Sequence, residues 1–140
     1  MDLTLTPIGA VESALADLDA APRQGDEGAP EAWLVIDPRF AAALDGLAPG
    51  DDLLVFTWLD RARRDLLRVH PRGDTTRPEA GVFATRSPHR PNPIGLHRVE
   101  LVAVSGAPTS GDAVRLLVRP LEAVHGTPVL DLKPVLRDER

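Results

Sequence analysis

The chain has 140 residues and a mass of 15.1 kDa, which fits one compact domain, since domains cluster near about 100 to 150 residues. It has no cysteine, and this excludes disulfides, thiol nucleophiles and thiolate zinc sites. No apolar run reaches the ~18 to 20 residues of a membrane span, and the start, Met1-Asp2, lacks the pattern of a secretory signal. We therefore expect a soluble, cytoplasmic, single domain over residues 1–140 without a membrane segment.

The net charge of −5 is unevenly distributed. Residues 1–60 hold 12 acids and two arginines, whereas residues 61–98 hold nine arginines and three acids. The cations of this central segment are all arginine, whose planar guanidinium suits phosphates, carboxylates and stacked bases. The alternative is compositional, because this chain uses arginine almost everywhere that lysine would serve.

Fourteen prolines and 11 glycines divide the chain into short pieces, which favours strands joined by turns. Residues 37–47 predict a short helix, with Asp37 as its N-cap, Pro38 in the first turn and Gly46 as its stop. Residues 114–119 alternate apolar side chains with polar ones, which predicts a half-buried strand. In chain order, strands are expected at 3–11, 32–36, 53–59, 66–70, 81–85, 96–104, 114–118 and 129–132. This spacing predicts an all-β fold, a small β-barrel with one or two short helices.

Residues 84–96 form the densest unusual segment of the chain. Its three prolines restrict their own backbone and that of the preceding residues, so the segment is rigid before any ligand binds. Prolines donate no ladder hydrogen bond, which leaves Asn92, Arg86 and Arg90 free to face a partner at a low entropic cost. A plain rigid loop is the alternative interpretation.

Two further segments carry candidate binding residues. Gly126 permits an unusual turn, and the strand after it places Asp131 and Lys133 on one face. The pair is either a simple ion pair or a carboxylate held beside a ligand. Arg23, between Pro22 and Gln24, is either a loop charge or a clamp for a ligand carboxylate. Standard site motifs are absent and the four histidines are scattered, so we predict no metal site.

Several motifs occur together in this chain in a fixed order. They are Pro7-Ile8-Gly9, Pro22-Arg23-Gln24, GVFATRSP at 81–88, RPNPIGL at 90–96 and GTPVLDLKP at 126–134. On these motifs, residues 4–136 resemble the TsaA-like (TrmO) family of tRNA methyltransferases. The resemblance implies a small β-barrel that forms a homodimer and binds S-adenosylmethionine near the subunit interface. It also implies N6-methylation of the threonylcarbamoyl-modified adenosine next to the tRNA anticodon.

The resemblance further implies particular site residues. The implied cofactor pocket consists of Pro22, Arg23, Gln24, Asp52, Leu53, Arg86, Asn92, Leu96, Gly126, Thr127 and Pro128. Asp131 is the candidate proton acceptor, unless it only orients Arg86 or Lys133. We expect Arg61, Arg64 and Arg90 to contact tRNA.

Two alternatives to a tRNA methyltransferase stay open. The same pocket would serve a small-molecule acceptor, which the overall acidity and the absence of tyrosine favour. A cofactor-binding module without transfer is the third possibility. The tRNA hypothesis predicts salt-sensitive RNA binding through the central arginines.

Overall fold

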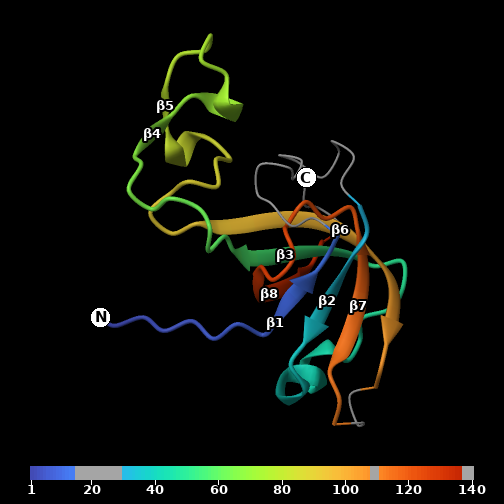
Figure 1. Ribbon diagram of the computed structural model, residues 1–140. Helices are drawn as coiled ribbons and strands as arrows, with labels where there is room; N and C mark the ends of the chain where they lie inside the picture. The colour runs from blue at the N-terminus through green and yellow to red at the C-terminus, as the bar shows by residue number, and fades with distance from the viewer. Residues whose placement is uncertain (15–29, 108–110, 137–140) are drawn as a thin grey trace.

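The computed structural model describes residues 1–14, 30–107 and 111–136, and six of its strands form a closed antiparallel barrel (Figure 1). The barrel strands are β1 (Gly9–Glu12), β2 (Ala32–Ile36), β3 (Asp52–Trp58), β6 (Ile94–Ser105), β7 (Val114–Arg119) and β8 (Pro128–Pro134). Around the barrel the order is β1-β2-β7-β6-β3-β8, with β1 also pairing with β8. The predicted all-β barrel is therefore confirmed. None of the helices in the described ranges is long and apolar enough to cross a membrane.

The core lies inside the barrel and is built by alternating side chains. On β7, Val114, Leu116 and Val118 are buried, whereas the residues between them are more exposed. Strands β2 and β3 show the same alternation. Successive side chains of a strand point to opposite faces, so apolar residues at every second position of the sequence all lie on the face that packs in the core. Burial of each large aliphatic side chain contributes about 1.5 to 3 kcal/mol.

The helix predicted after β2 is present as the 3-10 helix η3 (Pro38–Leu44). Asp37 is its N-cap, and Asp37 Oδ1 accepts a hydrogen bond from the backbone N–H of Arg39 at 3.0 Å. Its buried residues Ala41 and Leu44 belong to the core. Gly46, with φ of 99°, follows shortly after the helix ends, in the left-handed region that glycine favours.

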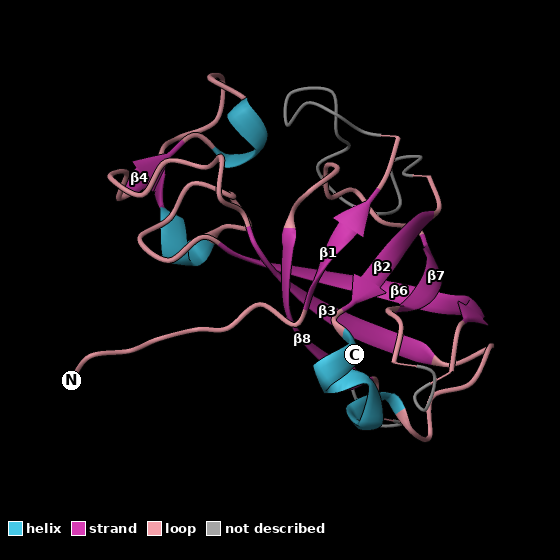
Figure 2. Ribbon diagram, turned by 60° about the horizontal axis from the view of Figure 1, so that its bottom comes forward, coloured by secondary structure: helices cyan, strands magenta, loops and turns pink. Residues whose placement is uncertain are grey.

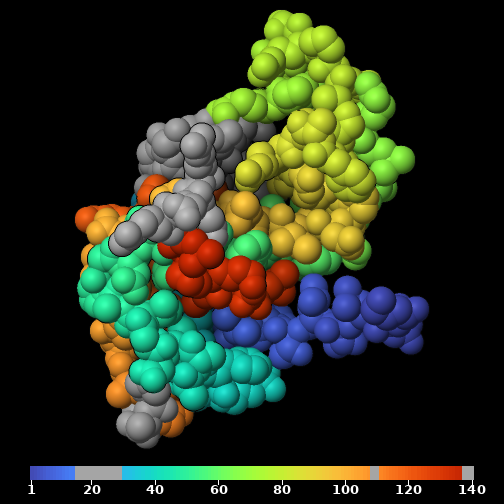
Figure 3. All heavy atoms as spheres, turned by 180° about the vertical axis from the view of Figure 1, so that it is seen from behind, coloured from blue at the N-terminus to red at the C-terminus, as the bar shows by residue number. Residues whose placement is uncertain are grey.

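Residues 59–93, which we call the arginine lobe, leave the barrel between β3 and β6. The lobe contains a two-stranded sheet of β4 (Arg68–Val69) and β5 (Ala80–Gly81), and the 3-10 helices η4 (Pro71–Gly73) and η5 (Val82–Ala84). It extends away from the barrel in both ribbon views and from behind (Figures 1–3). Eight arginines and four acids give it a net charge of +4. Most of the central positive charge therefore sits on one protruding part of the molecule.

The strand predicted at 3–11 is shorter in the structure, because only Gly9–Glu12 is a strand. Residues 1–7, which we call the N-terminal arm, run away from the barrel (Figures 1 and 2), and Leu3 and Leu5 are exposed. The N–H of Ile8 donates to Val129 O at 2.8 Å. Pro7 has no N–H to donate, which gives a physical reason for the arm to leave β8 here.

The lobe strands also differ from the prediction. The strand expected at 66–70 is only Arg68–Val69, and that expected at 81–85 is mainly the 3-10 helix η5. Val82 N donates to Leu67 O at 2.9 Å, after which the Thr85 N–H turns back to Val82 O at 3.1 Å. The expected strands are short here because β4 and β5 pair only with each other, in a sheet of two strands. The described chain also has three 3-10 helices, where one or two helices were expected.

Candidate functional site

An open groove of about 1850 Å³ runs between the arginine lobe and the adjoining surface of the barrel. Among the described residues, Arg86 and Arg90 line it from the lobe, and Leu96, Glu122 and Thr127 line it from the barrel side. Pockets for small molecules usually measure about 300 to 1000 Å³. The groove therefore has room for a nucleoside-sized ligand together with part of a larger one.

Arg86 lines the groove with a guanidinium that can bind an anion. Its side chain is exposed, and within the described ranges it takes part in no hydrogen bond or ion pair. The backbone on both sides is held, because Thr85 Oγ1 donates to Val82 O at 2.9 Å and accepts from Ser87 N at 3.1 Å. A guanidinium on a fixed loop suits a carboxylate or a phosphate.

Arg90 lines the groove but also stabilises its own loop. Its Nη1 donates to Thr85 O at 3.2 Å and to Ser87 O at 2.8 Å, and its guanidinium lies 5.9 Å from the centre of the Phe83 ring. These carbonyls would lose a donor if Arg90 turned toward a ligand. Arg90 therefore has a structural role whatever else it binds.

Arg64 connects the proline-rich segment to the barrel. Its Nε donates to Pro91 O at 2.7 Å, its Nη2 donates to Asn92 Oδ1 at 3.1 Å, and its guanidinium lies 5.2 Å from the Trp58 ring centre. Neither Arg64 nor Asn92 is among the described residues that line the groove. Arg61 is the remaining predicted tRNA contact, and it does line the groove.

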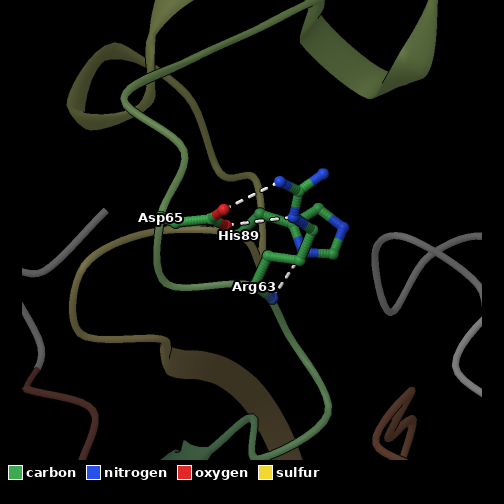
Figure 4. A network of polar contacts seen from close by, with 3 residues as sticks. All are labelled: Arg63, Asp65 and His89. Carbon is green, nitrogen blue, oxygen red and sulfur yellow. Dashed lines mark hydrogen bonds and ion pairs between the residues drawn. The ribbon is translucent and has the colours of Figure 1, made fainter.

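Arg63, Asp65 and His89 form a small polar network on the lobe (Figure 4). Arg63 donates to Asp65 through Nε at 3.0 Å and Nη2 at 2.8 Å, and its backbone N–H donates to His89 Nδ1 at 3.0 Å. The hydrogen bond from Arg63 holds the pKa of Asp65 below its ordinary value. The network joins the start of the lobe to the proline-rich segment.

The turn at Gly126 follows the prediction, with φ of 86° and its N–H donating to Val11 O at 2.7 Å. Thr127 is buried, its hydroxyl donates to Val124 O at 2.7 Å, and it lines the groove. Pro128 pairs with Ala10 of β1. Of this predicted trio, only Thr127 is among the described lining residues.

The other predicted cofactor residues are divided between the groove and the core. Asp52 and the 41% exposed Leu96 line the groove, and Asp52 Oδ2 lies 3.9 Å from Arg98 Nη2. Leu53 is fully buried in the core because it faces inward where its neighbour Asp52 faces outward. Pro22, Arg23 and Gln24 lie outside the described residues.

Asp131 pairs with Lys133 on β8, with 3.3 Å between Oδ2 and Nζ. Its Oδ1 accepts a hydrogen bond from the N–H of Leu132 at 2.9 Å. Both charged side chains are exposed, and neither lines the groove among the described residues. The structure therefore shows Asp131 and Lys133 as an ion pair outside the described groove lining.

Sequence reasoning missed a polar cluster at the groove. His97 Nε2 lies 2.7 Å from Thr57 Oγ1, and His97 Nδ1 lies 2.5 Å from Glu122 Oε1. His97 and Glu122 line the groove. The position of His97 in the sequence could have indicated this cluster. Gly95, His97 and Val99 are every second residue of β6, so all three lie on its inward face. A polar residue on an apolar strand face needs a buried hydrogen-bond partner.

A family model described as the tRNA-methyltransferase O N-terminal domain matches residues 10–139. The chain belongs to this family. Its structure resembles the crystal structure of TrmO from Pseudomonas aeruginosa, with a TM-score of 0.72 and 31% identity. That similarity covers 100% of this chain, which spans only 61% of the solved chain.

Two curated relatives differ in what their names state. A "Probable S-adenosyl-L-methionine-binding protein" from Methanothermobacter thermautotrophicus is 41% identical over 138 residues, 99% of this chain and 93% of the relative. A rat protein named "tRNA (adenine(37)-N6)-methyltransferase" is 45% identical over 60 residues, 43% of this chain and 12% of the relative. The longer match therefore names cofactor binding, and the shorter one names methyl transfer to tRNA.

Proposed function

We propose that this protein uses S-adenosylmethionine to methylate N6 of the threonylcarbamoyl-modified adenosine next to the anticodon of a tRNA. The observation that carries the proposal is Arg86, unpaired within the described chain, in a groove beside the arginine lobe of a TrmO-family barrel. We further propose that residues 1–140 act as one domain. With a tRNA substrate, we expect the protein to act in the cytoplasm.

The residues present fit the cofactor. Arg86 suits its carboxylate, and the half-exposed Leu96 offers apolar contact in a groove that both side chains line. When bound, S-adenosylmethionine supplies an electrophilic methyl group. The chain's own contribution is to hold donor and acceptor in line. We assign cofactor binding to Arg86, Leu96 and Thr127, with Asp52 at the groove edge and Pro22, Arg23 and Gln24 retained from the family resemblance.

The arginine lobe supports a tRNA partner. The lobe has a net charge of +4, whereas the whole chain has a net charge of −5. An anionic polymer is therefore attracted to the lobe in preference to the rest of the surface. Arg61 lines the groove and suits a phosphate next to the modified base. Arg64 and Arg90 act at least in part through the loop that they stabilise.

A specific observation also favours cofactor binding without RNA. The M. thermautotrophicus relative, which matches 99% of this chain, is named only for binding S-adenosylmethionine. Arg64 and Arg90, both predicted to contact tRNA, already donate hydrogen bonds within the lobe. A small-molecule methyltransferase or a cofactor-binding module is therefore the second candidate.

We also propose that the protein is a homodimer, assembled through the N-terminal arm. The arm exposes Leu3 and Leu5, separated by polar Thr4, in an unpaired segment. Strand β8 pairs with β1 only at Pro128 and Val129, so the rest of that β8 edge has no β1 partner. An unpaired segment and an incompletely paired edge on one chain can complete each other between two copies.

The test measures methyl transfer from labelled S-adenosylmethionine to total tRNA. The tRNA comes from a strain that makes the threonylcarbamoyl group but does not add the N6-methyl group. We expect label in tRNA with the wild type and loss of most of it with Arg86→Ala. Arg39→Ala is the matched control, because Arg39 lies on η3 and pairs with Asp37 at 3.4 Å, outside the groove lining. A wild type that binds the cofactor but labels no tRNA would contradict the tRNA assignment.

A further inference from the structure

Three polar side chains from distant parts of the sequence meet beside the groove. Thr57 comes from β3, His97 from β6, and Glu122 from the connection between β7 and β8. Thr57 is fully buried and the His97 side chain is 5% exposed, whereas that of Glu122 is 16% exposed. Glu122 is therefore the member of the cluster with the greatest access to the groove.

The hydrogen bonds define what each group does. A carboxylate only accepts, so His97 Nδ1 carries the proton that it donates to Glu122 Oε1 at 2.5 Å. In a neutral ring Nε2 is then an acceptor, and the Thr57 hydroxyl donates to it at 2.7 Å. The chain Thr57–His97–Glu122 thus fixes the orientation of the Glu122 carboxylate.

The second carboxylate oxygen of Glu122 has a different environment. Within the described ranges, Oε1 accepts from His97 but Oε2 has no hydrogen-bond partner. Glu122 lines the same groove as Arg86, Leu96 and Thr127. An oriented carboxylate with one free oxygen at a ligand groove is the arrangement that general base catalysis requires.

We propose that Glu122 is the proton acceptor of methyl transfer, with His97 and Thr57 as positioning residues, an inference that rests on the proposed function. As the acceptor nitrogen forms its bond to the methyl carbon, the carbon–sulfur bond breaks and its electron pair stays on sulfur. The nitrogen loses its proton to Glu122 Oε2, so the positive charge of the sulfonium and the negative charge of the carboxylate are both neutralised in the step. Asp131, the candidate from the sequence, is paired with Lys133 away from the described groove lining.

The test compares Glu122→Gln with wild type in single-turnover methyl transfer to tRNA that carries the threonylcarbamoyl group but no N6-methyl group. We expect the rate to fall by about 10²- to 10⁴-fold, the usual contribution of a general base. Binding of S-adenosylhomocysteine and of tRNA, measured by calorimetry, should be unchanged. Glu12→Gln is the matched control, because Glu12 pairs with Arg115 outside the groove lining and its loss should leave the rate unchanged.

The positioning role has its own readouts. His97→Gln should lower kcat by about 10- to 100-fold, as loss of an orienting residue does, and leave KM unchanged. Nitrogen NMR of the wild type, without cofactor or RNA, should show the tautomer of His97 protonated at Nδ1. Observation of the Nε2-protonated tautomer would contradict the hydrogen-bond chain.

The outcomes separate the two proposals. If the wild type methylates tRNA and Glu122→Gln does so at the same rate, Glu122 is not the proton acceptor although the proposed function stands. If Glu122→Gln loses S-adenosylhomocysteine binding, Glu122 is a binding residue and the inference is overturned. If the wild type methylates no tRNA, the proposed function is wrong, and the assignment of Glu122 as its proton acceptor is wrong with it.

Discussion

Gly95 and His97 face the same side of β6, and the missing side chain at Gly95 leaves the space in which His97 meets Thr57. A Cβ on residue 95 would lie 2.3 Å from Thr57 Oγ1 and 2.8 Å from His97 Nε2. These distances are too short for any side chain. The glycine of the proline-rich segment is therefore coupled to the buried polar cluster.

Gly95→Ala should destabilise the protein by about 1 to 3 kcal/mol, the usual effect of overpacking a filled interior. The added methyl group must displace Thr57 or His97 and so break their hydrogen bond. Denaturant unfolding measures the change. Gly81→Ala is the matched control, because its nearest atom, Leu67 O, is 4.0 Å from the added Cβ. Equal stability of both variants would show that the cluster has room to relax.

Replacement of Leu3 and Leu5 by aspartate should convert the proposed dimer into a monomer of 15.1 kDa. The two leucines are 77% and 49% exposed in one chain, and the proposal buries them against a second copy. Analytical ultracentrifugation measures the mass. Leu67→Asp, at a 69% exposed position on the lobe, should leave the dimer intact. If the wild type sediments as a monomer at every concentration, the proposed dimer through the N-terminal arm is wrong.

Arg61→Gln should weaken tRNA binding and reduce the slope of log affinity against log salt by about one, as expected for loss of one phosphate contact. Arg64→Gln should instead lower lobe stability, because it removes the donors to Pro91 O and Asn92 Oδ1. Filter binding at several salt concentrations, together with hydrogen exchange of the lobe, distinguishes the two effects. If the slope of log affinity against log salt is the same for Arg61→Gln and wild type, Arg61 does not contact the RNA.

The Asp65 carboxyl should titrate below its ordinary pKa of 3.8, because the hydrogen bond from Arg63 favours its ionised form. A lowered pKa in the folded state stabilises the protein above pH 3.8, and this contribution is lost as the pH falls through the folded pKa. Carboxyl NMR measures the midpoint. Arg63→Ala should return that midpoint toward 3.8, and an unchanged midpoint would assign the shift to another group.

The sequence by itself determined the barrel strands and the helix cap. Alternation in 114–119 and the order Asp37-Pro38 are local patterns, and local backbone geometry is sufficient to interpret them. The family motifs likewise indicated the segment that carries Arg86. The strand predicted at 3–11 included the N-terminal arm, although pairing within the chain begins only at Ile8, after Pro7.

Only the tertiary structure decided which polar residues share the groove. Thr57 and His97 are 40 positions apart and His97 and Glu122 are 25 apart, and the pairing of β3 with β6 brings the first two together. It also decided that Arg64 stabilises a loop and that Asp131 pairs with Lys133. The physical reason is that the periodicity of apolar residues and the propensity for secondary structure depend on residues close in the sequence. Hydrogen bonds between side chains depend instead on which strands lie next to each other when the barrel closes.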